Sequence, residues 1–223
     1  MLLLALDTST SAVTVAVHDG EQVLAEPTTL DTRRHTEMLT PSIRDAMVEA
    51  GRKPADLTAV AVGVGPGPFT GLRVGIATAA TLGLVLDILV HGVCSLDVLA
   101  HEAAAVGAGP EFLVATDARR KEVYWARYTR MLDGVQRASG PEVSRPADLP
   151  AQMRSLPTAG HGPILYPEDF GTPLQPVAVS AGLLAAYALD ELAAGRSLLP
   201  VRPLYLRQPD AKPTVAHKSV LPT

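Results

Sequence analysis

The chain begins with short hydrophobic runs separated by turn residues, a pattern that predicts strands. Residues 2–6 are continuously apolar, which is typical of a strand buried on both faces. Residues 13–17 alternate valine with other residues, at the period of a strand with one inward face. Asp19-Gly20 is a hairpin signal, and residues 21–26 are expected to return as a third strand. The chain is therefore expected to open as three strands.

Apolar residues spaced three and four apart predict a first helix over residues 33–50. Met38, Leu39, Ile43 and Met47 recur at this spacing. Packing in the core of the protein is the simpler interpretation of this face. A docking surface for a partner helix is the alternative, since methionine-rich faces adapt well at interfaces.

The rest of the chain has the pattern of alternating strands and helices. The predicted strands are 59–64, 88–93, 112–115 and 122–128, with a short strand within 131–140; the predicted helices are 70–87, 95–106, 146–153 and 180–194. After a glycine-proline break at 107–110, a strand, an aspartate and a second strand partly repeat the opening of the chain. Residues 200–207 are expected to be extended, and the polar residues after them to be mobile.

One stretch between a strand and a helix, residues 62–75 (VGVGPGPFTGLRVG), is rich in glycine and proline. Gly65 and Gly67 allow backbone angles that other residues avoid, and the prolines beside them stiffen the turn. Thr70 is well placed to cap the following helix. Small residues then recur at every fourth position: Gly71, Gly75, Ala79 and Gly83. This spacing places them on one helix face, where another backbone or a ligand can come very close.

Two interpretations of this turn stay open from the residues alone. The first is a phosphate cradle, in which N–H groups at a helix N-terminus face an anion. The second is tight strand-to-helix packing, or a surface docked against another protein. The turn is not a P-loop, because Gly71 is not followed by Lys and Ser/Thr. The prolines also remove donors where a pyrophosphate would need them.

Composition and charge exclude several classes of protein. The chain carries 19 Lys and Arg against 23 Asp and Glu, and its net charge of −4 argues against an autonomous nucleic-acid-binding protein. The single cysteine, Cys94, cannot form an internal disulfide, which fits a reducing compartment. The apolar N-terminal run stops at Asp7 and is too short for a signal peptide or a membrane span. We therefore expect a soluble, cytoplasmic protein.

The sequence contains no GxSxG, CxxC or HExxH motif, and its six histidines are scattered, so no metal site follows from spacing. Asp7 ends a buried strand before a Thr/Ser-rich turn. Such an aspartate could hold a metal–phosphate or cap the turn with its own backbone. The basic run Arg119-Arg120-Lys121 is more typical of a solvated turn than of a nucleic-acid site.

Motifs along the chain resemble, in the expected order, those of the TsaB (YeaZ) family. They are Asp7-Thr8-Ser9-Thr10, His35-Thr36-Glu37-Met38-Leu39, the stretch from Gly65 to Arg73, Asp117-Ala118-Arg119 with Glu122-Val123-Tyr124, and Pro203-Leu204-Tyr205-Leu206-Arg207. The resemblance covers residues 1–207. It implies an α/β fold of the actin-like, sugar-kinase and Hsp70 ATPase type (ASKHA), with two lobes that are each a mixed β-sheet with helices.

The expected division of the chain follows from the partial repeat and from this fold. The first lobe would span 1–106, with 195–207 packing back on it. The second lobe would span 107–194, and 208–223 would be a mobile tail.

The resemblance also implies a function in tRNA modification. Members of the family pair with a related catalytic subunit, TsaD, which transfers a threonylcarbamoyl group to the N6 of the adenosine beside the anticodon. A small ATPase, TsaE, joins the assembly. The expected partners are therefore a TsaD-like subunit and a TsaE-like ATPase, and tRNA is reached through the complex.

Departures from the catalytic relatives imply a scaffold rather than an enzyme. The catalytic paralogue holds a metal with a His-x-x-x-His pair, whereas here His35 is followed four residues later by Leu39. Catalytic members of the fold offer Asp-x-Gly to the phosphates from the second lobe, whereas Asp117 is followed by Ala118 and Arg119. We therefore expect no catalytic residues, no metal and no cofactor held by this chain alone.

Two sets of site residues follow. The first is a docking face for the catalytic subunit: Met38, Leu39, Ile43 and Met47. The second is a structural turn that is a remnant of a nucleotide site: Asp7, Gly65, Gly67, Thr70 and Arg73. ATP or ADP could bind where the chain meets its partner, and the isolated chain could be a homodimer. The alternatives are an ATPase or kinase with its own nucleotide site, and a metallo-glycoprotease, which the missing second histidine disfavours.

Overall fold

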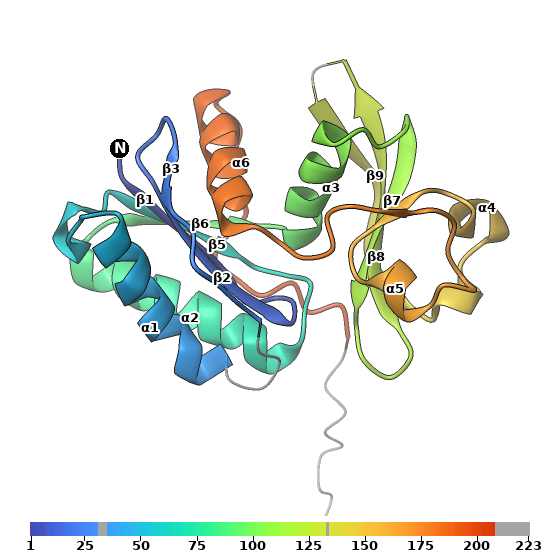
Figure 1. Ribbon diagram of the computed structural model, residues 1–223, viewed down its shortest axis with the longest axis horizontal. Helices are drawn as coiled ribbons and strands as arrows, with labels where there is room; N and C mark the ends of the chain where they lie inside the picture. Colours follow the sequence, from blue (N-terminus) through green and yellow to red (C-terminus); the bar gives the residue numbers. More distant parts are fainter. Residues whose placement is uncertain (31–34, 133, 208–223) are drawn as a thin grey trace, which may run out of the picture.

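The computed structural model describes residues 1–30, 35–132 and 134–207. The chain forms two lobes side by side, each built on a mixed β-sheet with helices, which confirms the predicted fold class (Figure 1). The first part of the chain forms β1 (Leu3–Asp7), β2 (Ala12–His18), β3 (Val23–Ala25), β4 (Thr28–Leu30), α1 (His35–Glu49), a 3-10 turn (Pro54–Asp56), β5 (Ala59–Gly63), α2 (Phe69–Leu86) and β6 (Leu89–Val93). The later elements are α3 (Ser95–Ala105), β7 (Glu111–Asp117), β8 (Val123–Met131), β9 (Gly134–Ser144), a 3-10 turn (Pro146–Asp148), α4 (Ala151–Arg154), β10 (Thr158–Ala159), α5 (Gly162–Leu165), β11 (Pro173–Leu174) and α6 (Ala181–Ala193).

The first sheet has the strand order β3-β2-β1-β5-β6, and β4 also pairs with β2. Its central strand β1 is antiparallel to β2, with Leu3 opposite His18, and parallel to β5, with Leu3 opposite Ala59. All five residues of β1 are buried. The continuous apolar run at the start of the chain follows from this position, because elements cover both faces of the strand.

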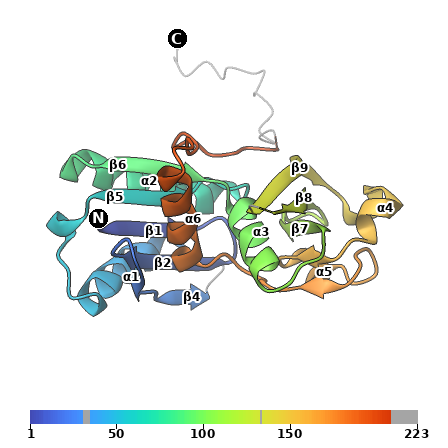
Figure 2. The ribbon, with the colours of Figure 1, turned by 90° about the horizontal axis from the view of Figure 1, so that it is seen from above.

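Helices cover the two faces of the first sheet differently (Figure 2). Helices α1 and α2 pack on one face, where Leu4 and Leu6 of β1 join their core. Helix α6 packs on the other face, where Leu3 and Ala5 point. Alternate residues of one strand therefore enter two separate cores, as the period of a strand requires.

The second sheet has the strand order β11-β10-β7-β8-β9. Strand β7 is antiparallel to β8 and parallel to β10, so this sheet is mixed as well. Strand β9 runs for 11 residues, although the sequence indicates only a short strand there. It lies at the edge of the sheet and alternates exposed with half-buried residues, so it carries little hydrophobic signal.

Helices α3 and α6 lie between the two sheets, and each packs on the sheet of the other predicted lobe (Figure 1). Helix α3, expected in the first lobe, packs on β7, β8 and β9. Helix α6, expected in the second lobe, packs on β1 and β2. Periodicity shows which face of a helix is apolar but not which sheet covers that face. The contacts of these two helices therefore cross the predicted division at residues 106 and 194.

The segment after α6 returns to the first sheet. Leu199 pairs with Gly92 of the edge strand β6, and the Leu204 N–H donates to the carbonyl of Val64 over 2.8 Å. These contacts join the segment to the ends of β5 and β6. The predicted tail, 208–223, and the predicted start of the first helix lie outside the described residues.

Candidate functional site

The turn after β1 surrounds a buried carboxylate. Asp7 is 1% exposed, and its Oδ1 accepts hydrogen bonds from the N–H and the hydroxyl of Ser9, both over 2.7 Å. Its Oδ2 accepts from the hydroxyl of Ser95, the first residue of α3, over 2.6 Å. A Cβ added at Gly63 would collide with the same carboxylate. Asp7 therefore ties β1, β5 and α3 together from the inside.

The next residues of this turn fill the space beside the glycine-proline stretch. The Thr8 hydroxyl donates to the carbonyl of Gly71 over 2.8 Å, and a Cβ at Gly75 would collide with that hydroxyl. A Cβ at Gly67 would collide with the backbone of Ser9. The glycines of the turn and of α2 thus allow the chain's own β1–β2 turn to approach. This packing favours the structural interpretation of the stretch over the phosphate cradle.

Two further residues of the predicted turn have clear positions. Thr70 is not the N-cap: α2 begins at Phe69 after Pro68, and no side chain caps it. Pro68 takes the N-cap position instead, because proline has no N–H and is tolerated at the start of a helix. Gly65 has a φ of +98°, so its position does require glycine, and its carbonyl accepts from the Ser95 N–H over 2.8 Å.

Arg73 lies on the outer side of α2 within an aromatic cluster. Its Nε donates to the Tyr205 hydroxyl over 2.9 Å, and its guanidinium lies 3.9 Å from the centre of the Phe69 ring. The Phe69 and Tyr205 rings stack with centroids 5.3 Å apart. Phe69 is 50% exposed and Tyr205 44% exposed. The sequence motifs contain Phe69, Arg73 and Tyr205, but they do not show that the three side chains meet, because Tyr205 is distant along the chain.

The turn after β7 differs from the turn after β1, although it also follows an aspartate. The Oδ1 of Asp117 accepts from the Arg119 N–H over 2.7 Å, and its Oδ2 lies 3.0 Å from the Arg119 guanidinium. Arg119, Arg120 and Lys121 are exposed and have φ angles of 60°, 56° and 62°. Three consecutive residues other than glycine in the left-handed region are unusual and strained.

The C-terminal segment connects this turn to the aromatic cluster. The Arg207 guanidinium donates to the carbonyl of Ala118 over 3.2 Å and forms an ion pair with Glu122. Two residues earlier, Tyr205 stacks on Phe69. One short extended segment thus contacts α2 of the first lobe and the β7–β8 turn of the second.

A cavity of about 410 Å³ lies between the two turns. Thr10, Ser11, Thr116, Asp117, Arg119 and His161 contribute to its lining. The Thr116 hydroxyl is buried and makes no hydrogen bond within the described part of the chain. The cationic group that lines the cavity, Arg119, already pairs with Asp117, so little positive charge remains for a polyphosphate.

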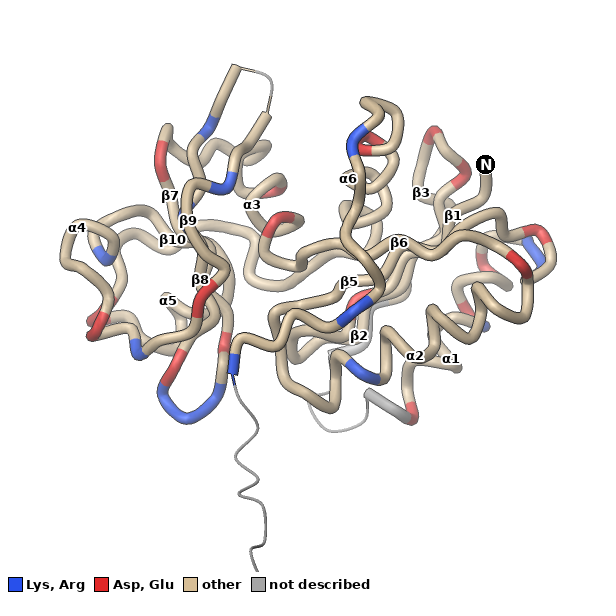
Figure 3. The backbone as a smooth tube through the Cα atoms, turned by 180° about the vertical axis from the view of Figure 1, so that it is seen from behind, with Lys and Arg blue, Asp and Glu red and all other residues tan. Residues whose placement is uncertain are grey.

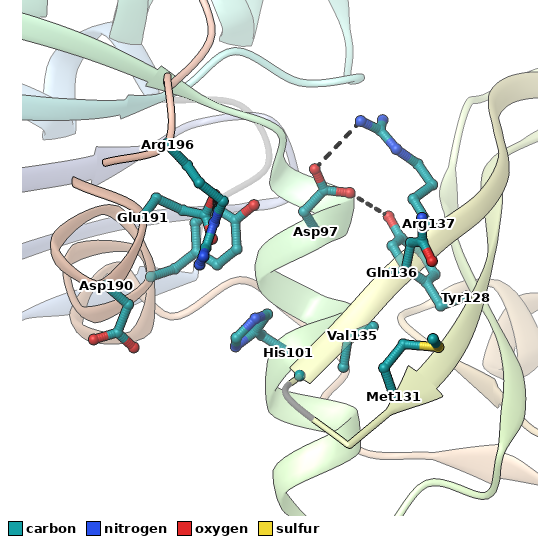
Figure 4. Close-up of a pocket in the computed structure, with 12 residues that line it drawn as sticks. Asp97, His101, Tyr128, Met131, Val135, Gln136, Arg137, Asp190, Glu191 and Arg196 are labelled. Atoms are coloured by element: carbon teal, nitrogen blue, oxygen red, sulfur yellow. Dashed lines mark hydrogen bonds and ion pairs between the residues drawn. The ribbon is translucent and has the colours of Figure 1, made fainter. Parts of the chain in front are cut away.

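A second cavity, of about 670 Å³, lies between α3, α6 and the β8–β9 hairpin. Figure 4 shows Asp97 between Tyr128, which donates to it over 2.7 Å, and Arg137, 3.5 Å away. Burial raises the pKa of the Asp97 carboxyl, and Arg137 opposes that rise. Burial also raises the pKa of the nearby Cys94 thiol to about 12, so the thiol is protonated and unreactive at neutral pH. No group of three His, Cys, Asp or Glu suited to a metal occurs among residues 1–30, 35–132 and 134–207.

The predicted docking face of α1 needs correction. Leu39 is 1% exposed and Met47 is 3% exposed, because both side chains pack in the core between α1 and the first sheet. Met38 and Ile43 are half-buried. The apolar spacing of α1 therefore reports the protein's own core. The side chain of His35, at the start of this helix, lies outside the described residues.

The exposed apolar surface lies on α2 instead. Its small residues Gly71, Gly75, Ala79 and Gly83 are buried towards the sheet, which turns the larger apolar side chains outward. Leu84 is 84% exposed and Val85 is 73% exposed, and Val48 of the adjacent α1 is 73% exposed. Helix α2 is the one described helix long and apolar enough to span a membrane, yet its glycine face packs on β5. The spacing of the glycines in the sequence could have predicted this surface, because it identifies the face of α2 that packs on the sheet and therefore also the opposite, exposed face.

Known proteins match most of the chain. The sequence family described as TsaD, tRNA N6-adenosine threonylcarbamoyltransferase, matches residues 22–196. An uncharacterized protein of Mycobacterium leprae is 47% identical over 96% of this chain, which spans 57% of that relative's length. The tRNA threonylcarbamoyladenosine biosynthesis protein TsaB of Escherichia coli is 36% identical over 70% of this chain and 68% of its own length.

A solved structure matches equally broadly. YeaZ from Pseudomonas aeruginosa superposes with a TM-score of 0.77 at 31% identity, covering 92% of this chain and 99% of that one. The likeness therefore includes both lobes and the segment that joins them. On sequence and on structure, this chain belongs to the TsaB (YeaZ) family of tRNA threonylcarbamoyladenosine biosynthesis proteins.

Proposed function

We propose that this chain is a non-catalytic subunit that docks a TsaD-like transferase through the outer face of α2, for threonylcarbamoylation of the adenosine next to the anticodon in tRNA. The observation that carries the proposal is the apolar face around Leu84 and Val85, which the protein's own fold leaves open. Exposed apolar patches on helices mark sites of protein association. The family of the E. coli relative gives the process in which the association takes place.

The state of Asp7 supports a role without catalysis by this chain alone. Its carboxylate accepts three hydrogen bonds inside the fold, from Ser9 and Ser95. A carboxylate used in this way does not face the cleft to hold a metal–phosphate. We propose that the chain has no cofactor of its own, that ATP or ADP binds only where chain and partner meet, and that a TsaE-like ATPase joins this cytoplasmic assembly.

The docking face is tested with Leu84→Glu, measured as the dissociation constant for the TsaD-like subunit by calorimetry or sedimentation. Burying an unpaired carboxylate in an apolar interface should weaken assembly at least about tenfold. The matched control is Leu132→Glu, which places the same change at an exposed leucine of the β8–β9 hairpin. Unchanged affinity for Leu84→Glu would exclude α2 as the docking face.

The same face offers a homodimer as the alternative use when the partner is absent. Sedimentation of the isolated chain tests this alternative. If the chain forms a dimer through α2, Leu84→Glu should convert the dimer into monomers. A dimer that survives this substitution must use another surface.

An ATPase with its own nucleotide site is the second candidate, and the cavity beside the buried Thr116 hydroxyl is the observation in its favour. Calorimetry of the isolated chain with ATP and Mg²⁺ separates the two functions. The scaffold function expects no heat of binding and no hydrolysis, and expects modified tRNA only after the partner is added.

A further inference from the structure

The aromatic cluster of Phe69, Arg73 and Tyr205 has features that internal stability does not require. Phe69 and Tyr205 each leave about half of their surface open, although burying an aromatic ring is strongly favourable. Other aromatic residues of the chain, such as Trp125 and Tyr128, are buried. Two stacked, exposed rings with a guanidinium over one of them form a fixed platform on the surface.

The β7–β8 turn is the second unusual feature on this side of the molecule. Glycine or asparagine would adopt its left-handed backbone with less strain than Arg119, Arg120 and Lys121 do. The long side chains of these three residues gain no burial, because all three residues are exposed. Arg119 uses its side chain to pair with Asp117, but Lys121 gains no burial from its left-handed backbone. Strain that is kept at this exposed cation points to a use outside the protein.

Both features carry positively charged side chains, Arg73 in the first and Lys121 in the second. The whole chain has a net charge of −4. None of the ion pairs within the described part of the chain includes Arg73, Lys121 or Arg202. Figure 3 shows Lys and Arg positions in the β7–β8 turn and along the last described segment, which lie on the same side of the molecule.

The segment that ends at Arg207 connects the aromatic cluster to the β7–β8 turn, so that the two form one continuous surface. Arg207 bonds to the β7–β8 turn, Tyr205 stacks on Phe69, and Arg202 is exposed three residues before Tyr205. We call this surface, formed by Phe69, Arg73, residues 119–121, Arg202 and Tyr205, the basic ridge. Leu84 and Val85 lie at the opposite end of α2, so the ridge and the apolar docking face use different parts of that helix.

We infer that the basic ridge binds the tRNA on which the assembled enzyme acts. Fixed cations match the phosphate backbone, and exposed aromatic faces match unpaired bases, which stack on such rings in single-stranded RNA. Aromatic rings also occur at protein interfaces, so contact with the partner subunit is the alternative that the test separates from RNA binding. Arg73, Lys121 and Arg202 hold phosphates, and the Phe69–Tyr205 pair stacks a base. This inference rests on the proposed function, because the chain meets tRNA as a subunit of the complex.

The test uses the assembled complex with its TsaD-like partner and measures the dissociation constant for tRNA by filter binding over a series of salt concentrations. Phe69→Leu keeps an apolar side chain but removes the aromatic face, and it should weaken binding at least about fivefold. Lys121→Asn removes one charge and suits the left-handed backbone. It should lower the slope of log affinity against log salt by about 0.7–0.9.

The matched control removes charge away from the ridge. Arg52 and Lys53 are exposed in the connection after α1, and the double variant Arg52→Gln/Lys53→Gln changes the net charge more than Lys121→Asn does. It should leave both the tRNA affinity and the salt slope unchanged. A loss equal to that of Lys121→Asn would mean that only net charge matters, and would overturn the ridge as a specific site.

Assembly is measured on the same samples, so that the two proposals fail separately. If Leu84→Glu leaves assembly intact, the proposed docking function fails. If the complex forms with Phe69→Leu and Lys121→Asn and binds tRNA as the unsubstituted complex does, only the ridge fails. If Phe69→Leu weakens assembly and leaves tRNA binding per complex unchanged, the rings contact the partner protein, and the inference is overturned.

Discussion

The turns after β1 and after β7 hold the same place in their sheets, at the end of a strand that pairs antiparallel with the next strand. Each follows an aspartate at the last position of its strand, Asp7 and Asp117. The Asp7 carboxylate is buried beneath three hydrogen bonds, whereas the Asp117 side chain is 24% exposed and pairs with Arg119. The turn after β1 is part of the core, whereas the turn after β7 lies on the surface with its charged side chains.

The difference bears on the proposal that this chain alone holds no metal–phosphate between its lobes. A polyphosphate site between the lobes needs groups from both turns that face the cleft. Here the first turn directs its carboxylate to Ser95 of α3, and the second neutralises its cation with its own aspartate. These contacts support that proposal, because both carboxylates are engaged within the fold.

The largest expected effect comes from crowding the buried turn. Gly63→Ala places a methyl group against the Asp7 carboxylate and about 2.9 Å from the Ser95 hydroxyl. It should lower the free energy of unfolding by about 3 kcal/mol or more, because the buried carboxylate loses its hydrogen bonds. Urea denaturation measures this loss.

The control for that substitution is Gly109→Ala, where an added Cβ meets nothing within 4 Å. It should change the free energy of unfolding by no more than about 0.5 kcal/mol. Similar values for the two variants would mean that the turn after β1 tolerates rearrangement and is not part of a rigid core.

A smaller loss of stability is expected when either aspartate is replaced by asparagine. Asp7→Asn replaces one carboxylate oxygen by an amide N–H₂, which cannot accept the hydrogen bond that Ser9 or Ser95 donates there. It should lower the free energy of unfolding by about 1–3 kcal/mol. Asp117→Asn breaks a partly exposed ion pair and should lower it by less than about 1 kcal/mol. Urea denaturation of both variants at neutral pH compares the two turns directly. Equal losses would remove the distinction drawn between them.

The smallest expected effect is a gain in stability. Lys121→Gly removes a side chain from a residue with a φ of 62° and should raise the free energy of unfolding by about 0.5–1 kcal/mol. The matched variant Lys53→Gly changes a residue with a φ of −103° and should give no gain. Thermal denaturation measures both. A loss of stability for Lys121→Gly would show that the turn after β7 is not strained.

The sequence predicts those parts of the fold in which burial and periodicity agree. The continuous run of β1 is buried on both faces, and the apolar spacing of α1 faces a core, so the simpler interpretation of Leu39 and Met47 was correct. Helix α2 is apolar nearly all round, so hydrophobicity gives no direction for it. Its glycine spacing does, because a sheet can approach most closely where side chains are smallest.

The candidate site depends on contacts that no local pattern contains. Arg73 was identified from its motif, but its partner Tyr205 lies in the last described segment. The strain in the β7–β8 turn was also hidden, because arginine and lysine have no preference for the left-handed region. Distant pairing and backbone conformation therefore had to come from the structure.

The position of α6 has a consequence for synthesis of the protein. A chain leaves the ribosome with its N-terminal end first, and domains usually fold in that order. Here the inner face of β1 and β2 is covered by residues 181–193, and the edge strand β6 is paired by Leu199. The core on this face of the first sheet is therefore completed only after residues 181–199 have been translated. Until then its Leu3 and Ala5 face is open, and a chaperone that binds apolar strands has time to act on it.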